Sequence, residues 1–92
     1  MENSVIIIGG ISGGIGSALA KNLIKSDKTV AGFARNQKQL DAFLTECPEV
    51  ETHVCDATDP EALRSCFDEI KASHEQIGAY VHAIGSIFLK LD

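Results

Sequence analysis

A glycine-rich turn near the start of the chain has the spacing of a phosphate-binding loop. It follows the apolar run at residues 5–8, and its glycines are Gly10, Gly13, Gly14 and Gly16. Where a strand turns directly into a helix, free backbone N–H groups and the positive end of the helix dipole point at one spot, and a phosphate can approach closely if no Cβ intervenes. We therefore expect this turn to hold a pyrophosphate. The alternative is that the glycines serve only a tight turn and close helix packing.

The residues after the turn exclude one large class of phosphate-binding proteins and predict a helix. A kinase or ATPase loop would carry lysine directly after its last glycine, whereas Gly14 is followed by Ile15. Ile15, Ala18, Leu19 and Leu23 then recur at helical spacing. The turn is thus expected to open a helix.

The cysteines and histidines show no metal-binding pattern. Cys47, Cys55 and Cys66 are eight and eleven residues apart, which matches no Cys-x-x-Cys motif, and we expect free, reduced thiols. His53 and His74 have no ligand spacing with neighbouring aspartates or cysteines, and we place both on the solvated surface. No metal site is predicted.

Four β-type stretches alternate with three helical patterns. The expected strands are residues 5–8, 29–33, 50–55 and 79–84, and the third is expected near a sheet edge. The second helix should end near Pro48, and Asp59-Pro60-Glu61 is a typical helix start. Strands that alternate with helices of about 10–15 residues generally form a parallel sheet with right-handed crossover connections. The sequence predicts one three-layer α/β domain over residues 1–92, with helices on both faces of the sheet.

Composition and charge limit the kinds of binding partner and the cellular compartment that we expect. Hydrophobic residues make up 45% of the 92 residues, and the net charge is −5 without any basic run, which argues against nucleic-acid binding. The longest aliphatic run has four residues, far fewer than the about 20 that span a bilayer. The acidic, polar start does not look like a signal peptide. We expect a cytoplasmic protein without a membrane partner.

Three motifs in chain order resemble those of the short-chain dehydrogenases/reductases. Gly10-Ile11-Ser12-Gly13-Gly14-Ile15-Gly16 is similar to their Gly-x-x-x-Gly-Ile-Gly fingerprint, Asp56-Ala57-Thr58 to their Asp-Val/Leu-Thr segment beside adenine, and Val81-His82-Ala83-Ile84-Gly85 to their Val-Asn-Asn-Ala-Gly strand. The resemblance implies an NAD(P)-binding Rossmann-like fold with strand order 3-2-1-4, truncated after strand four. It also implies that the first and third motifs flank one crevice. The cofactor-binding residues it implies are Gly10, Ser12, Gly13, Gly14, Ile15, Gly16, Asp56, Ala57, Ala83 and Gly85.

The motifs also depart from the family pattern. Gly9 replaces a threonine before the first motif glycine, and His82 and Ala83 replace two asparagines. Ile84 replaces a small alanine. We expect His82 to be a half-buried strand histidine bonded to the backbone and not a catalytic group.

The end of the second strand bears on the choice between NAD and NADP. An NAD-specific Rossmann site usually has an acid there, and this chain has Ala34 followed by Arg35. A guanidinium can bind a phosphate through two hydrogen bonds, and Ser12 and Asn36 could add more. By resemblance, NADP is therefore favoured over NAD. The alternative is that Arg35 is a solvated loop cation.

The family's catalytic pair is absent from these residues. Its chemistry depends on a Tyr-x-x-x-Lys motif, but the single tyrosine, Tyr80, lies in the fourth strand and is followed four positions on by Ile84. We expect the cofactor-binding part of an NADP-preferring oxidoreductase, with hydride transfer to a carbonyl or alcohol only when the missing C-terminal half is supplied. The alternative is a stand-alone nucleotide-binding or interaction module without redox activity.

The fourth strand raises a further expectation about assembly. If the sheet ends there, residues 80–84 present an edge with unpaired N–H and C=O groups and apolar side chains on both faces. We therefore expect a homo-oligomer formed through this edge.

Overall fold

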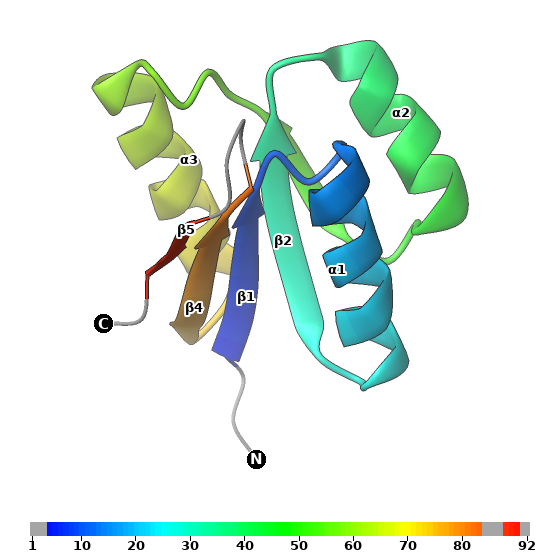
Figure 1. Ribbon diagram of the computed structural model, residues 1–92. Helices are drawn as coiled ribbons and strands as arrows, with labels where there is room; N and C mark the ends of the chain where they lie inside the picture. Colours follow the sequence, from blue (N-terminus) through cyan, green and yellow to red (C-terminus); the bar gives the residue numbers. More distant parts are fainter. Residues whose placement is uncertain (1–3, 84–87, 91–92) are drawn as a thin grey trace.

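The computed structural model describes residues 4–83 and 88–90, which form one sheet covered by helices on both faces (Figure 1). The sheet order is β3-β2-β1-β4-β5, and the first four strands in the chain run parallel. The predicted parallel order 3-2-1-4 is confirmed. The strands are β1 (Ser4–Gly9), β2 (Thr29–Ala34), β3 (Glu51–Val54), β4 (Gln76–His82) and β5 (Phe88–Lys90), and the helices are α1 (Gly14–Lys25), α2 (Gln37–Glu46) and α3 (Pro60–Ser73).

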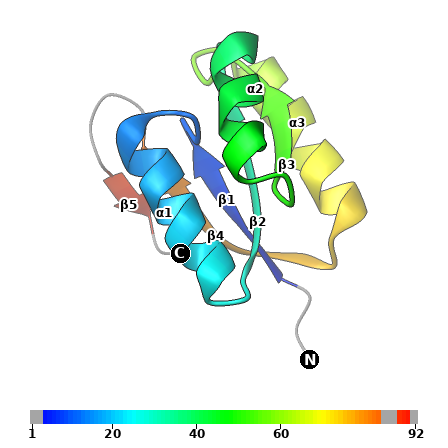
Figure 2. The ribbon, with the colours of Figure 1, turned by 90° about the vertical axis from the view of Figure 1, so that its right-hand side faces the viewer.

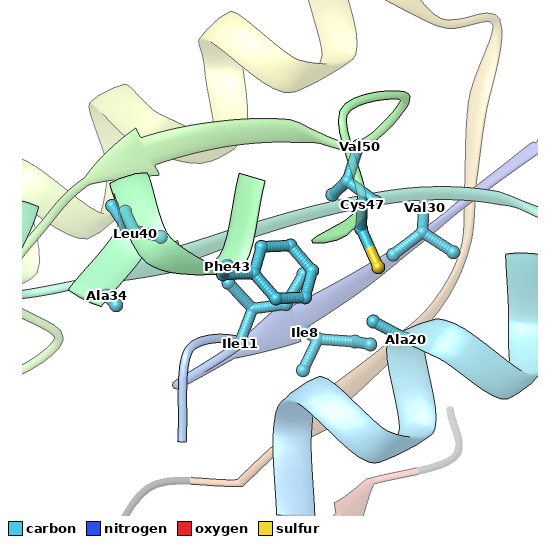
Figure 3. Close-up of a cluster of buried hydrophobic side chains, with 9 residues drawn as sticks. All are labelled: Ile8, Ile11, Ala20, Val30, Ala34, Leu40, Phe43, Cys47 and Val50. Atoms are coloured by element: carbon cyan, nitrogen blue, oxygen red, sulfur yellow. The ribbon is translucent and has the colours of Figure 1, made fainter. Parts of the chain in front are cut away.

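The two faces of the sheet carry separate hydrophobic cores. Helices α1 and α2 lie side by side on one face, and α3 covers the other (Figures 1 and 2). The core under α1 and α2 is drawn in Figure 3 and consists of Ile8, Ile11, Ala20, Val30, Ala34, Leu40, Phe43, Cys47 and Val50. The core under α3 consists of Val5, Ile7, Ala31, Phe33, Cys55, Cys66 and Ile70. Because β1 and β2 send side chains into both cores, their sequences are unbroken apolar runs.

The helix starts follow from their capping residues, with one exception. The Asp59 side chain accepts hydrogen bonds from the N–H groups of Glu61 and Ala62, at 3.1 and 3.3 Å, which confirms the predicted start of α3. The Asn36 side chain accepts from the Gln39 N–H at 3.0 Å and caps α2. No side chain caps α1, whose N-cap is Gly13. The first turn of α1 therefore offers N–H groups that no capping side chain occupies.

The expected pattern of α1 holds only in part. Leu19 and Leu23 pack against the first core, and Ala20 is fully buried. Ile15 is 56% exposed and Ala18 is also exposed, so neither side chain belongs to the core.

Among the described residues, no helix combines the length and the apolar composition needed to cross a membrane.

The last strand corrects the expectation about assembly. β5 runs antiparallel to β4 and covers its outer edge, and the register pairs Tyr80 with Lys90, Val81 with Leu89, and His82 with Phe88. The expected unpaired edge is therefore absent from Tyr80 to His82, and Ile84 lies outside the described residues. Self-association through a bare β4 edge loses its structural basis.

The two histidines that we expected on the solvated surface are instead bound to one carboxylate. His53 Nε2 lies 2.7 Å from Glu51 Oε2, and His74 Nε2 lies 2.9 Å from Glu51 Oε1. Both imidazole side chains are about four-fifths buried, at 21% and 18% exposed. Glu51 begins β3 and His74 caps the end of α3, so the three side chains join the amino end of β3 to the last turn of α3.

We expect Glu51→Gln to destabilise the fold in a pH-dependent way. Burial raises the pKa of Glu51, but the hydrogen bonds to His53 and His74 outweigh it and hold the pKa below its ordinary value of 4.5. A carboxyl with a depressed pKa in the folded state stabilises the fold above its unfolded pKa and loses that effect as the pH falls through the folded pKa. The expected loss at pH 6 is about 1–3 kcal/mol of unfolding free energy.

Urea unfolding of wild type and Glu51→Gln at pH 6 and pH 3 measures this effect. The difference between the two proteins should be smaller at pH 3 than at pH 6, because the stabilisation by the ionised carboxyl is lost as the pH falls through its folded pKa. Glu49→Gln is the matched control, because Glu49 is exposed two residues earlier. Equal stability of wild type and Glu51→Gln at pH 6 would contradict this account.

Candidate functional site

A cavity of about 490 Å³ lies where the parallel strands end. It is lined by the connections that follow β1, β2 and β3 and by Ala83 after β4. In Figure 1 these three connections lie together at the upper end of the sheet. In open parallel sheets this carboxyl edge, at the point where the strand order reverses, is the usual binding position. Here the order reverses between β1 and β4.

The turn after β1 is held tightly against β2. Gly10 and Ile11 donate their N–H groups to the Phe33 carbonyl at 2.8 and 3.2 Å, and the Gly13 N–H donates to the Gly10 carbonyl at 3.1 Å. Gly10 has φ 78°, a conformation that favours glycine. Gly10, Ser12 and Gly13 line the cavity. The turn is thus a fixed wall of the site.

Two glycines in the first turn of α1 differ in what requires them. A Cβ at Gly16 would lie 2.3 Å from the Gly10 carbonyl oxygen, so close packing explains Gly16. Among the described residues, and apart from its chain neighbours and the backbone of its own helix, a Cβ at Gly14 would meet no atom within 4 Å, and the φ of Gly14 is not positive. The alternative that the glycines serve only the turn and its packing therefore accounts for Gly16 but not for Gly14.

The connection after β2 brings a cation and an amide to the cavity. Ala34, Arg35 and Asn36 line it, and Arg35 and Asn36 are exposed. The side-chain oxygen of Asn36, Oδ1, is used in capping α2. Its amide nitrogen remains as the donor for any ligand, since the cap needs only the oxygen.

The connection after β3 brings a carboxylate to the same cavity. Asp56 Oδ1 accepts from the Thr58 hydroxyl at 2.7 Å and from the Thr58 N–H at 2.9 Å. These two hydrogen bonds hold the pKa of Asp56 below its ordinary value, and the charge of Arg35 acts in the same direction. Asp56 is therefore ionised at neutral pH and can accept hydrogen bonds from a ligand.

The fourth wall of the cavity is tied to the first strand. The Ala83 N–H donates to the Gly9 carbonyl at 2.9 Å, and Ala83 lines the cavity. His82 Nδ1 lies 2.6 Å from the Tyr80 hydroxyl, which corrects the expectation that His82 bonds to the backbone. Burial raises the pKa of Tyr80 to about 12, so the phenol stays protonated at neutral pH.

Gly9, which stands where the motif that the turn resembles has a threonine, has a structural reason. A Cβ at Gly9 would lie 2.6 Å from the Tyr80 hydroxyl and 2.9 Å from the Phe33 ring. The Tyr80 and Phe33 rings stack with their centroids 6.2 Å apart. Gly9 therefore provides the space that these rings occupy.

The structure gathers most of the predicted site residues around one cavity. Those that line it are Gly10, Ser12, Gly13, Arg35, Asn36, Asp56, Ala57 and Ala83. Gly14, Ile15 and Gly16 do not line it; they follow the lining residue Gly13 in the first turn of α1. Gly85 lies outside the described residues.

Other lining residues were not predicted as site residues. They are Ala34, Gln39, Cys55 and Thr58. The spacing Asn36-x-x-Gln39, typical of a capping box, could have placed Gln39 in the first turn of a helix next to Arg35. All three cysteines carry free thiols. Within the part of the chain that the structure describes, no group of three or more His, Cys, Asp or Glu side chains is arranged so that it could hold a metal ion.

The chain is similar to proteins of one family along nearly all of its length. The family model described as short chain dehydrogenase matches residues 4–90. Dehydrogenase/reductase SDR family member 11 of Gallus gallus is 28% identical over 87 residues, which cover 88% of this chain and 34% of the relative. The Homo sapiens protein of that name is 27% identical over 90 residues, covering 91% and 35%. The chain thus spans about a third of these relatives' length.

Solved structures show the same arrangement. The 2-keto-3-deoxy-D-gluconate dehydrogenase of Streptococcus agalactiae superposes with a TM-score of 0.84 at 25% identity, over 95% of this chain and 34% of that one. A metagenomic short-chain oxidoreductase, solved in complex with NADP, superposes with a TM-score of 0.77 at 27% identity, over 87% of this chain and 38% of that one.

Proposed function

The chain belongs to the short-chain dehydrogenase/reductase family, and from this premise we propose that it is the dinucleotide-binding part of an oxidoreductase, with NADP preferred over NAD. The observation that carries the proposal is Gly14, where an added Cβ would meet no atom of the described residues within 4 Å. Gly14 begins the helix that no side chain caps, and it directly follows Gly13, which lines the cavity. A ligand that must approach the backbone there accounts for both features.

The first turn of α1 is suited to the pyrophosphate of a dinucleotide. Its N–H groups and the positive end of the helix dipole favour an anion, and the first turn contains no acidic residue that would repel one. The exposed Ile15 side chain lies in this turn and can contact the ligand. In this proposal α1 binds and orients the cofactor.

The connections after β2 and β3 are suited to the adenosine end. Arg35 provides a planar guanidinium for a phosphate on the ribose, and Ala34 leaves no carboxylate at the position where NAD-specific sites hold ribose hydroxyls. Asp56, ionised and turned toward Thr58, is an acceptor for the adenine amino group. The NADP complex of the metagenomic relative supports this choice of cofactor.

Reaction and substrate belong to the proposed whole protein. A bound nicotinamide dinucleotide supplies a hydride for reduction of a carbonyl or accepts one from an alcohol. Tyr80 is a poor proton donor for such a step, because it is half-buried and its hydroxyl is committed to His82. The alternative function, nucleotide binding without redox chemistry, is distinguished by supplying the Tyr-x-x-x-Lys segment of a relative in trans and assaying carbonyl reduction.

The cofactor preference is tested by substitutions that remove or reverse the charge of Arg35. Charge-assisted hydrogen bonds to the ribose phosphate should favour NADPH over NADH by about 10- to 100-fold in affinity. Arg35→Ala should remove most of that preference, and Arg35→Asp should reverse it, because a carboxylate repels the phosphate and accepts from free ribose hydroxyls.

Titration calorimetry of both cofactors at one salt concentration measures this ratio. Lys38→Ala is the matched control, since it removes a cation from the first turn of α2 that does not line the cavity. Equal affinities of wild type for NADPH and NADH would show that Arg35 is only a solvated loop cation.

A further inference from the structure

The Gln39 side chain stands at the boundary between two cavities. It lines the main cavity and also a smaller one of about 210 Å³, which is bordered by residues of α1 and α2. Ser12 likewise lines both, and its hydroxyl lies 3.5 Å from Gln39 Oε1, at the outer limit of a hydrogen bond. These two side chains, one from the glycine turn and one from α2, therefore separate the two spaces.

The position of Gln39 is set by the start of α2. The backbone N–H of Gln39 donates to the Asn36 side chain at 3.0 Å, which fixes the first helical turn directly after Arg35. On the far side of the smaller cavity, Lys21 and Glu46 form an ion pair that joins α1 to α2. Gln39 is thus held between two anchored elements and faces the same cavity as Arg35.

The carboxamide of Gln39 has donors to spare. Its oxygen faces the Ser12 hydroxyl, so the amide nitrogen carries two N–H donors that this contact does not use. A phosphate monoester presents three terminal oxygens, of which a guanidinium can bind two. The third oxygen is free to accept from another N–H donor, and the carboxamide of Gln39 has such donors, whereas a carboxylate at this position would repel the phosphate.

We propose that Gln39 is a specificity-determining residue of the cofactor site, which donates an N–H to the ribose 2′-phosphate of NADP and keeps the Ser12 hydroxyl beside it. The inference rests on the proposed function and extends it to a residue outside the three family motifs. NAD, with a free hydroxyl at that position, gains little from Gln39.

The experiment is Gln39→Glu with Gln37→Glu as its matched control. Both substitutions place a negative charge in the first turn of α2, where it favours the helix dipole. Residues two apart on a helix point to opposite sides, and Gln37 lines neither cavity. A glutamate at the third helical position also completes a capping box with Asn36, so Gln39→Glu should not lower the melting temperature.

Affinities for NADPH and NADH are measured by calorimetry on the full chain. Gln39→Glu should lower the affinity for NADPH by about tenfold or more and leave that for NADH within about twofold, since the introduced charge lies beside the ribose 2′-phosphate, which NADH lacks. Gln39→Ala should lower it by about 2- to 10-fold, through loss of the donor alone. Gln37→Glu should leave the ratio of the two affinities unchanged.

The outcomes separate this inference from the proposed function. An NADPH preference that depends on Arg35 but not on Gln39 would overturn the inference and leave the proposed function standing. An equal fall in both affinities, or the same fall in Gln37→Glu, would also overturn it. Failure of wild type to bind or to prefer NADPH would overturn both.

Discussion

Gly16→Ala is expected to destabilise the chain by about 1–3 kcal/mol, a large part of the stability of a domain this small. The added Cβ would lie 2.3 Å from the Gly10 carbonyl oxygen and 3.0 Å from Ile11 Cα, and both are backbone atoms. The turn cannot move away freely, because Gly10 and Ile11 are bonded to the Phe33 carbonyl of β2. The clash must therefore be relieved by shifting α1 or breaking these bonds.

Urea unfolding followed by circular dichroism measures the loss. Gly14→Ala is the control, since its Cβ meets nothing within 4 Å and alanine is the better helix former by about 0.5–1 kcal/mol. We expect Gly14→Ala to be as stable as wild type or more stable. A Gly16→Ala protein with the stability of wild type would show that the close approach of Gly16 to Gly10 does not constrain the turn.

Gly14→Ala, which we expect to leave the stability of the fold unchanged or higher, should weaken cofactor binding. We expect it to lose about 10- to 100-fold in affinity for NADPH, because the methyl group occupies the space through which a phosphate reaches the N–H groups of α1. The pyrophosphate is common to both cofactors, so the affinity for NADH should fall by the same factor. This distinguishes Gly14 from Arg35, whose substitution changes the ratio.

Calorimetric titration of wild type and Gly14→Ala with each cofactor tests this prediction, with unfolding curves of the same samples to confirm that the variant is folded. A fall in the affinity for NADPH but not for NADH would place Gly14 near the ribose phosphate instead of the pyrophosphate. Unchanged affinity for both would mean that the open space beside Gly14 does not receive a ligand.

The repeated units of this fold could be predicted because each is specified locally. The apolar runs of β1 and β2 reflect burial on both faces, and Asp59 caps α3 through bonds to residues two and three positions on. The site followed from the same logic, since three connections at one edge of a parallel sheet necessarily lie close together.

What could not be predicted depends on contacts between distant segments. Glu51 and His53, two positions apart on β3, share a face of the strand, but the bond from Glu51 to His74 spans 23 positions, and no spacing rule pairs those two residues. β5 has only three residues, too few to show a strand periodicity, and its pairing with β4 is antiparallel in an otherwise parallel sheet. Gln39 meets Ser12 across 27 positions, so its place at the cavity emerged only from the packing of α2 beside the glycine turn.

The most direct test of the central claim, that a dinucleotide binds at the carboxyl edge of the sheet, is a titration of the ¹⁵N-labelled full chain with NADPH followed by amide chemical shifts. The account predicts saturable shifts at residues 10–16, Arg35, Asn36 and residues 56–58. It predicts little change at Glu51 and His74, which lie at the amino end of β3 and the last turn of α3. Shifts centred on Glu51 and His74, or no saturable shifts at residues 10–16, would contradict it.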